Sequence, residues 1–284
     1  ISAGHIWKFI TLAYIPPTIA GIVLAYRGKL LAGGILTAFF IALQIMSNHV
    51  QMSYYFLFVI LFIAGAYFED AWRNKTLPRF FKASAVLLVA ALIGVDANLS
   101  NLYHTYTYSK ETMRGKSELV QTGDAAKQTS SGLDRDYITN WSYGIGETWT
   151  LLVPNFKGGS SSAPLSQSET AMEKANPMYG SLYNSFPQYF GSQPWTAGPV
   201  YVGAFVLFLF VLGCFIVKGP LKWALLGATF FSIVLAWGKN FMPLTDFFID
   251  YVPMYNKFRA VSSILVIAEF TIPLLAIFAL KRVL

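Results

Sequence analysis

Seven long apolar runs constrain this chain more than any other feature of its sequence. An α-helix of about 20 mostly apolar residues is long enough to cross the hydrocarbon core of a bilayer. Only 12% of the residues are charged, whereas a soluble domain carries about 25%. The sequence therefore predicts an all-α polytopic membrane protein with about seven transmembrane helices. The runs are Phe9–Tyr26, Leu30–Met46, Met52–Phe68, Phe81–Val95, Val200–Val217, Trp223–Trp237 and Val261–Leu280.

A hydrophilic stretch rich in Tyr, Trp, Ser, Gly, Asn and Pro separates the fourth run from the fifth. We predict three segments: transmembrane helices one to four in residues 1–97, a large mixed extracytoplasmic loop domain in 98–199, and transmembrane helices five to seven in 200–284. Within the loop, Ser168 precedes a helix-forming sequence (ETAMEKA) and Pro177 follows it. A capped short helix is expected there.

The distribution of Lys and Arg predicts the orientation of the chain. With seven alternating spans, ten basic residues flank one side and four flank the other. Cytoplasmic loops carry the excess of Lys and Arg, so the side with ten faces the cytoplasm. The long loop, the Ser47–Gln51 turn and the Gly238–Arg259 connection then share the outer side, where we expect them to open into one pocket. The net charge of +7 follows from topology and does not indicate nucleic-acid binding.

The cysteine content limits the possible classes of protein, and the chain ends indicate how much of the protein the sequence covers. The single cysteine, Cys214, lies inside an apolar run, which excludes a disulfide framework or a thiolate metal cluster. The carboxylates are scattered, and no metal site is predicted. Ile1 is not preceded by a basic region, and Leu284 directly follows a span, so we expect the sequence to be a fragment of a longer protein.

Polar residues at the ends of spans are the first candidates for substrate binding. His49 and Gln51 lie in the outer turn between spans two and three, where they could hold a phosphate or a sugar. A tight turn among lipid headgroups also favours polar residues, so both interpretations stay open. Asp96 closes span four, either lining a polar cavity or marking a helix end in water.

Two parts of the long loop carry further substrate-binding candidates. Arg114 and Glu118 lie around Gly115, where cations and close backbone N–H groups suit an anionic group; a solvated basic loop is the alternative. Trp141 and Glu147 lie in a segment of aromatics and glycines (WSYGIGE). Stacking faces beside a carboxylate are typical of sugar recognition, but the same residues could form the core of the loop.

Three cations on the outer side could bind the phosphate of a lipid. Lys257 and Arg259 precede span seven, and Lys239 follows span six. They run against the positive-inside trend, and Arg can bind a phosphate through two hydrogen bonds. Snorkelling of these side chains to headgroups is the alternative interpretation.

Several motifs in one order resemble the YfhO family of bacterial membrane proteins, in particular its Bacteroidetes members. The motifs cover most of the chain: NHVQMSYY, YSKETMRGKSELV, LDRDYITNWSYGIGETWTLLVPNFKGG, YFGSQPWTAGPVYVGA and PMYNKFRAVSSILVI. The resemblance implies a multi-pass protein of the bacterial cytoplasmic (inner) membrane and of the GT-C type. Such a protein transfers a sugar from a polyprenyl-phosphate donor to a cell-envelope polymer or glycan, and no cofactor is implied besides this donor.

The resemblance implies no catalytic residue in this sequence. Enzymes of the GT-C type place their catalytic acid residue in the first extracytoplasmic loop, which we expect upstream of Ile1. The residues that match family motifs are candidates for contact with substrate or lipid, and they are His49, Gln51, Arg114, Glu118, Trp141, Glu147, Lys257 and Arg259. The expected partners are membrane lipids, a lipid-linked sugar and an envelope acceptor, with no nucleic acid.

Two other functions fit the same topology. A transporter or flippase of a lipid-linked envelope precursor would need polar residues along a path through the membrane, and Glu269 lies within the seventh run. A non-catalytic membrane assembly subunit would use the aromatic loop as a docking surface. Transfer of a labelled sugar separates the enzyme from both alternatives.

Overall fold

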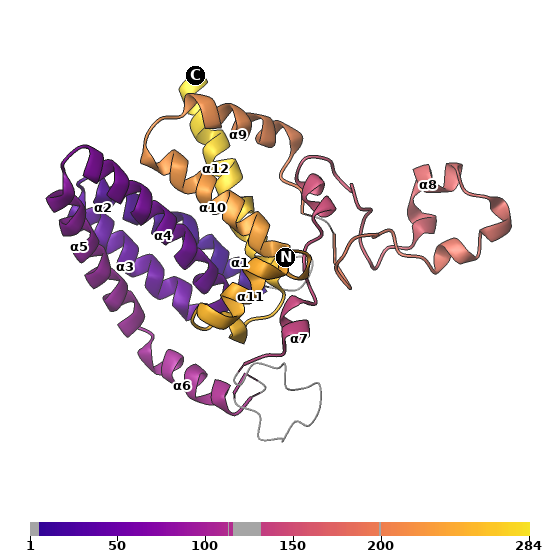
Figure 1. Cartoon of the computed structure of the whole chain (residues 1–284), viewed down its shortest axis with the longest axis horizontal. Coiled ribbons are helices and arrows are strands. Elements are labelled where there is room, and N and C mark those ends of the chain that lie inside the picture. Colours follow the sequence, from indigo (N-terminus) through magenta and orange to yellow (C-terminus); the bar gives the residue numbers. More distant parts are fainter. Residues whose placement is uncertain (1–5, 113, 116–131, 199) are drawn as a thin grey trace. The chain divides into compact units, whose positions relative to one another are not determined.

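The structure is a computed structural model that describes residues 6–112, 114–115, 132–198 and 200–284. The regular elements of these residues are helices, α1 to α12 with short 3-10 turns between them (Figure 1), and no strand occurs among them. The prediction of an all-α fold is confirmed. Residues Pro164 and Pro187 form an isolated antiparallel bridge.

Each predicted apolar run is helical over most of its length. The first run is divided at Tyr14, just before Pro16 and Pro17, into two helices. The fifth run begins four residues later than predicted, because Gly203 has a φ of +96° and interrupts the helix at that point. The helices are α1 (Ile6–Ala13), α2 (Ile15–Tyr26), α3 (Leu30–Met46), α4 (Val50–Arg73), α5 (Leu77–Asp96), α9 (Ala204–Ile216), α10 (Pro220–Ala236) and α12 (Val266–Val283).

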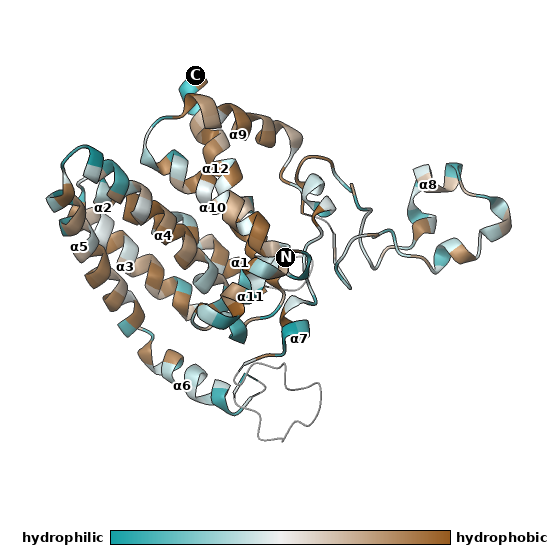
Figure 2. Ribbon diagram, in the orientation of Figure 1, coloured by the Kyte–Doolittle hydropathy of each residue, from teal (hydrophilic) through white to brown (hydrophobic). Residues whose placement is uncertain are grey.

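Four helical segments are long and apolar enough to cross a membrane: Ile6–Tyr26, Val50–Arg73, Leu77–Asp96 and Val261–Val283. A fifth results if α10 and Gly238–Tyr251, which are bent by 106° at Trp237, count as one broken span. Helices α3 and α9 have 17 and 13 residues, so α9 extends only about 20 Å. The composition of these helices is that of an α-helical membrane protein, and Figure 2 shows hydrophobic colours along them.

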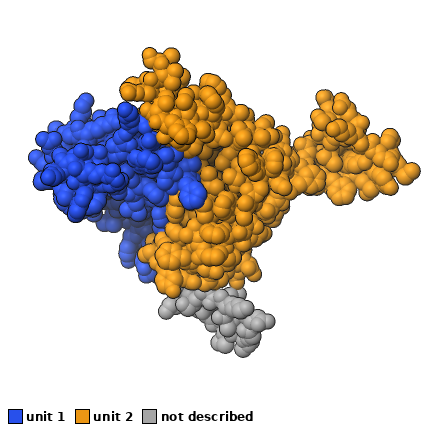
Figure 3. Space-filling model, turned by 45° about the horizontal axis from the view of Figure 1, so that its top comes forward, with its two compact units in different colours: residues 1–122, 130–132, 217–230 blue, residues 123–129, 133–216, 231–284 orange. Residues whose placement is uncertain are grey.

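By contact density the chain forms two compact units, coloured separately in Figure 3. Of the described residues, unit 1 comprises 6–112, 114–115, 132 and 217–230, and unit 2 comprises 133–198, 200–216 and 231–284. The boundary runs through α10. The boundaries of these units differ from those of the three predicted segments. Most of the described loop belongs to the same unit as the C-terminal helices, whereas α6 (Leu99–Lys110) belongs to the unit of the N-terminal helices.

Small residues bring the helices of unit 1 close together. A Cβ atom on Gly33 of α3 would lie 2.5 Å from the backbone nitrogen of Ala25 in α2. A Cβ atom on Gly94 of α5 would lie 2.8 Å from the carbonyl oxygen of Ala38 in α3. Such contacts are typical of helices in a bilayer, where close backbone packing replaces hydrophobic burial as the source of association. In unit 2, Gly213 of α9 packs against Leu275 and Ala279 of α12 in the same way.

Short capped helices and 3-10 turns make up the described part of the long loop. Ser168 caps α8 by accepting a hydrogen bond from the backbone of Ala171 at 3.4 Å, so the predicted short helix is confirmed. Asp134 caps α7 by accepting from the backbone of Asp136 at 2.7 Å. The elements are α7 (Arg135–Thr139), η2 (Gly146–Leu151), η3 (Leu165–Gln167), α8 (Glu169–Glu173), η4 (Pro177–Tyr179) and η5 (Leu182–Asn184).

Three short elements connect α10 to α12 in unit 2. They are η6 (Gly238–Phe241), α11 (Met242–Tyr251) and η7 (Tyr255–Lys257), and η8 (Val261–Leu265) leads into α12. The turns need left-handed backbone at Met254 and Ala260, with φ of 65° and 58°. We call residues 236–262 the outer connection, after the outer side on which the sequence predicts most of them to lie.

Candidate functional site

The structure distributes the predicted site residues over both units. Glu118 lies outside the described residues. The candidates in unit 1 are His49, Gln51, Asp96 and Arg114, and those in unit 2 are Trp141, Glu147, Lys239, Lys257 and Arg259. The pocket predicted to join the His49 turn to the outer connection stays a prediction. The grouping within unit 2 can be followed bond by bond.

Residues 133–148 of the loop are hydrogen-bonded along the outer connection. Irregular backbone away from water needs such partners, because each buried N–H or C=O group that lacks one is costly. The part of the loop that carries Trp141 and Glu147 and the part of the chain that carries the three cations are therefore one body. The backbone N–H groups of Leu133, Tyr143, Lys239 and Ser262 donate respectively to Asn256 O at 2.9 Å, Ala236 O at 2.8 Å, Ser142 Oγ at 2.8 Å and Trp141 O at 3.0 Å. The side chains of Asn240 and Trp237 donate to Tyr143 O at 2.9 Å and to Thr148 Oγ1 at 3.0 Å.

A glycine makes this close approach possible. Gly238 begins η6 with a φ of +48°, and a Cβ atom there would collide with Ser142 Oγ and lie 2.5 Å from Val261. The hydroxyl of Ser142 donates to Thr139 O at 2.5 Å and accepts from the backbone of Lys239. Sequence reasoning did not single out Gly238 or Ser142, although a glycine directly after an apolar run indicates a sharp turn.

Arg259 is held by two aromatic residues of the loop. Its guanidinium donates from Nη1 to Tyr137 Oη at 2.7 Å and lies 5.6 Å from the centre of the Tyr137 ring and 5.8 Å from that of Trp141. Trp141 is fixed in turn, because its indole N–H donates to the carbonyl oxygen of Trp195 at 3.1 Å. Contact with aromatic faces positions a guanidinium without neutralising its charge. The Arg259 side chain is exposed.

The two lysines differ in their surroundings. Lys239 is exposed on η6, and Lys257 is half-buried in η7. Burial lowers the pKa of Lys257 from its ordinary value, because the charged ammonium loses hydration. Lys239, Lys257 and Arg259 thus belong to the same outer connection, and their place on the outer side of the membrane stays a prediction.

The carboxylate of Glu147 is buried and binds three donors of the loop. The side chain is 2% exposed. Its Oε2 accepts from the backbone N–H groups of Gly144 at 2.6 Å and Ser192 at 3.2 Å, and its Oε1 accepts from Tyr189 Oη. A Cβ atom at Gly191 would collide with this same oxygen. Glu147 therefore ties residues 144–147 to residues 189–193, and its role in substrate binding stays a prediction.

Two tyrosines around Glu147 are kept neutral. Tyr143 donates to the carbonyl oxygen of Glu147 at 2.8 Å and pairs with Thr150 Oγ1 at 2.5 Å. Burial raises the pKa of Tyr143 to about 12. Burial also raises the pKa of Tyr189, and its hydrogen bond to Glu147 raises it further. Both phenols act as donors here at any physiological pH.

An ion-pair cluster joins α7 to α11. Arg135 binds Asp246 through Nη1 and Asp250 through Nη2, the latter at 2.5 Å. The two aspartates are four residues apart, so they lie on one face of α11 and accept both branches of one guanidinium. The pKa of Arg135 is raised, mainly by its hydrogen bond to Asp250. The sequence shows both aspartates and the arginine, but their separation of more than a hundred residues hides the pairing.

The candidates of unit 1 lie at helix ends. His49 is the N-cap residue of α4 and is half-buried. Gln51 donates from Nε2 to Tyr55 Oη at 2.9 Å. Asp96 is the last residue of α5 and is exposed, and Arg114 is half-buried in the turn after α6. Their assignment to substrate stays a prediction.

The chemistry available in unit 2 is anion binding beside aromatic faces. Within the described ranges, no group of three or more His, Cys, Asp or Glu side chains is placed to hold a metal ion. No protein-family model, curated protein or solved structure matches the chain.

Proposed function

We propose that the chain is part of a multi-pass glycosyltransferase-like protein of the GT-C type in the bacterial inner membrane. All seven apolar runs cross the bilayer, and the loop of residues 98–199 lies on the extracytoplasmic side. There the protein transfers a sugar from a polyprenyl-phosphate donor to a cell-envelope acceptor. The apolar helices support the membrane location, and the ordered motifs that resemble the YfhO family support the class.

The placement of Arg259 is the observation that carries this proposal. A phosphate group held at the membrane surface requires a cation whose position is fixed and whose charge is retained. Arg259 meets both requirements, because Tyr137 and Trp141 hold it and it is exposed. Lys257 and Lys239 in the same connection add positive charge, and Trp141 provides a face against which a sugar ring can stack.

The proposed reaction is an inverting displacement. The acceptor hydroxyl attacks the anomeric carbon of the donor sugar, and the bond from that carbon to the phosphate oxygen breaks. The phosphate leaves as an anion that Arg259 stabilises electrostatically, so strong acid catalysis of departure is unnecessary. The hydroxyl proton passes to a general base, which we assign to no residue of this sequence.

Sugar transfer by the full-length protein in liposomes tests the proposed function. A radiolabelled polyprenyl-phosphate sugar is supplied together with an envelope acceptor fraction, and labelled acceptor is the expected product. Movement of the donor across the bilayer without transfer would support the transporter instead. Neither transfer nor movement would favour the assembly subunit, and both of these results contradict the proposal.

The role of Arg259 is tested separately by donor binding. We expect Arg259→Ala to weaken binding of polyprenyl phosphate about ten-fold, which corresponds to about 1.4 kcal/mol, and Arg259→Lys to recover only part of this loss. Arg282→Ala removes an exposed arginine at the end of α12 and serves as the matched control. Equal binding by the Arg259→Ala and Arg282→Ala variants would show that the phosphate is bound elsewhere.

A further inference from the structure

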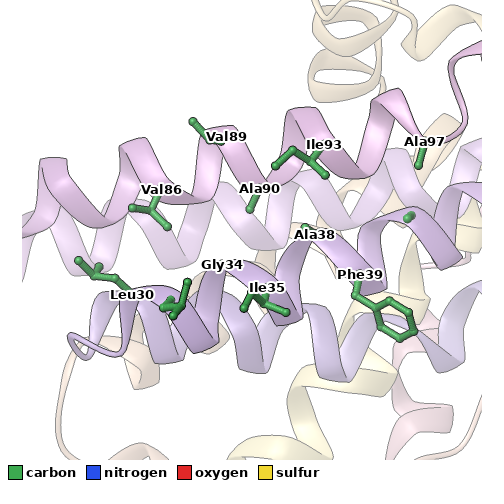
Figure 4. A pocket seen from close by; sticks show the side chains of 12 residues that line it. Leu30, Gly34, Ile35, Ala38, Phe39, Val86, Val89, Ala90, Ile93 and Ala97 are labelled. Carbon is green, nitrogen blue, oxygen red and sulfur yellow. The ribbon is translucent and has the colours of Figure 1, made fainter.

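An apolar groove of about 460 Å³ runs between α3 and α5 within unit 1 (Figure 4). Small residues form its floor, notably Gly34, Ala38 and Ala90. Larger side chains form its edges, among them Ile35 and Ile93, which are 63% and 58% exposed. The groove exists because small residues on both helices face one another between rows of larger ones.

The dimensions of the groove match one hydrocarbon chain in one leaflet. Its lining on α3 runs from Leu30 to Ala42, which is about 18 Å at 1.5 Å per residue. One leaflet of the hydrocarbon core is about 15 Å thick. A single acyl chain lying along the helices would therefore fill the groove from the membrane surface to about the midplane.

Cations gather at one end of the groove. Lys29 directly precedes Leu30, and Lys82 lies one turn before Val86 on the same face of α5. Arg27 follows Tyr26, whose ring stacks on Phe80 of α5 at 5.3 Å.

These cations are available to an anionic group. Arg27, Lys29 and Lys82 are exposed, and none of them forms an ion pair with another residue in the part of the chain that the structure describes. Tyr26 also pairs with Ser84 at 3.2 Å, which keeps the end of α2 against α5. The opposite end of the groove carries Asp96, an exposed carboxylate that would repel an anion. The charges therefore give the groove a direction.

We propose that this groove is a binding site for one anionic phospholipid of the membrane. One acyl chain lies between α3 and α5, and the phosphate headgroup lies against Arg27, Lys29 and Lys82. The site is independent of the donor site proposed in unit 2, because every residue that forms it belongs to unit 1. It would hold a structural lipid in the leaflet on the side where α5 begins, which the distribution of Lys and Arg predicts to be cytoplasmic.

Native mass spectrometry of the full chain released from detergent micelles tests this site. The probes are phosphatidylglycerol and phosphatidylcholine with identical acyl chains. We expect one retained phosphatidylglycerol, bound about a hundred-fold more tightly than phosphatidylcholine, because three cations contribute about 1 kcal/mol each. Each basic residue near an anionic headgroup contributes about a five-fold gain in affinity, so Lys82→Gln should weaken phosphatidylglycerol about five-fold. Lys75→Gln, which removes an exposed lysine of the adjoining turn, should have no effect.

A second pair of variants tests the groove itself. Ala38→Phe fills the groove and should weaken both lipids more than ten-fold, whereas Ala85→Phe adds the same volume at an exposed position of α5 that does not line it. Equal affinities for the two lipids, or equal effects within either pair of variants, would overturn the proposal. So would disulfide-linked dimers of a Phe39→Cys variant lacking Cys214, because a second copy would then cover the groove.

Discussion

Two regions of this molecule are held together by different interactions. The α2–α3–α5 layer of unit 1 relies on backbone proximity at glycines such as Gly21, Gly33 and Gly94. The loop in unit 2 relies on hydrogen bonds to backbone groups. Glu147 is the central acceptor within the loop, and Ser142 accepts from Lys239 of the outer connection. The first region is sensitive to atoms added at these glycines, and the second is sensitive to the loss of an acceptor.

The difference follows from the environment of each region, which is lipid for the helices and water for the loop. Between lipid chains, helices satisfy their own backbone groups, and association depends on close packing. Outside the hydrocarbon, the loop has little regular structure, so side chains and turns must satisfy its backbone. Removing the Glu147 acceptor should therefore destabilise the loop, and adding a methyl group at Gly33 should destabilise the packed helices of unit 1.

The largest effect is expected from Glu147→Ala. It leaves two backbone N–H groups and the Tyr189 hydroxyl without their acceptor, and a buried unsatisfied group costs about 1–3 kcal/mol. We expect the free energy of unfolding of this region to fall by about 4 kcal/mol. Hydrogen exchange measured by mass spectrometry should show lost protection at residues 142–147 and 188–193, with α2 and α3 unchanged.

Glu173→Ala is the matched control, because Glu173 is an exposed glutamate of α8 in the same unit. Its exchange pattern should equal that of the wild-type chain. If Glu147→Ala leaves residues 188–193 as protected as before, the carboxylate does not tie the two segments together.

Gly33→Ala should produce the next largest effect, in unit 1. The added methyl group would lie 2.5 Å from a backbone nitrogen of α2, which cannot move without separating the helices. Overpacking costs about 1–3 kcal/mol, and we expect a loss near the upper end in detergent unfolding. Gly65→Ala in α4 meets no atom within 4 Å and should be neutral or stabilising by up to about 1 kcal/mol. Similar losses in both variants would contradict the steric explanation.

The all-helical fold and the positions of most helices could be predicted from the sequence, whereas the seven membrane spans stay a prediction. Apolar runs extend over whole helices, so α3 was predicted at its exact ends, and the Ser168 cap located α8. Two features of the fold could not be predicted from hydropathy. The start of α9 depends on the left-handed backbone at Gly203, and the bend of 106° at Trp237 depends on packing around Gly238.

The candidate site was predicted only in part. The segment WSYGIGE identified Trp141 and Glu147, and Arg259 was identified because it runs against the positive-inside trend. Their partners could not be identified, since Tyr189 lies 42 residues from Glu147 and Tyr137 lies 122 residues from Arg259. Long-range pairing depends on three-dimensional packing, which a local pattern does not encode.

A change of pH should alter the free energy of unfolding of the loop region by less than the two substitutions above. A tyrosine in an unfolded chain has a pKa of about 10, and that of Tyr143 in the folded protein is about 12. Between these values Tyr143 loses its proton only in the unfolded chain. The contribution of Tyr143 to the free energy of unfolding is therefore complete below about pH 10 and falls by about 1.4 kcal/mol per pH unit above it. Thermal unfolding from pH 8 to 12 should show this slope, and Tyr143→Phe should reduce it. An unchanged slope in that variant would contradict the assignment.

Ion pairs provide the smallest and most easily screened difference. Arg135 binds two aspartates with side-chain exposures of 42% and 40%, and we expect Arg135→Gln to cost about 1 kcal/mol. The Arg73–Glu69 pair of α4 is 75% and 54% exposed, so Arg73→Gln should cost about 0.3 kcal/mol. Raising the salt concentration to about 1 M should remove most of both losses, because the Debye length then falls to about 3 Å. A loss at Arg135 that persists in high salt would mean that the guanidinium acts through directed hydrogen bonds, and the contact between α7 and α11 would then depend on geometry more than on charge.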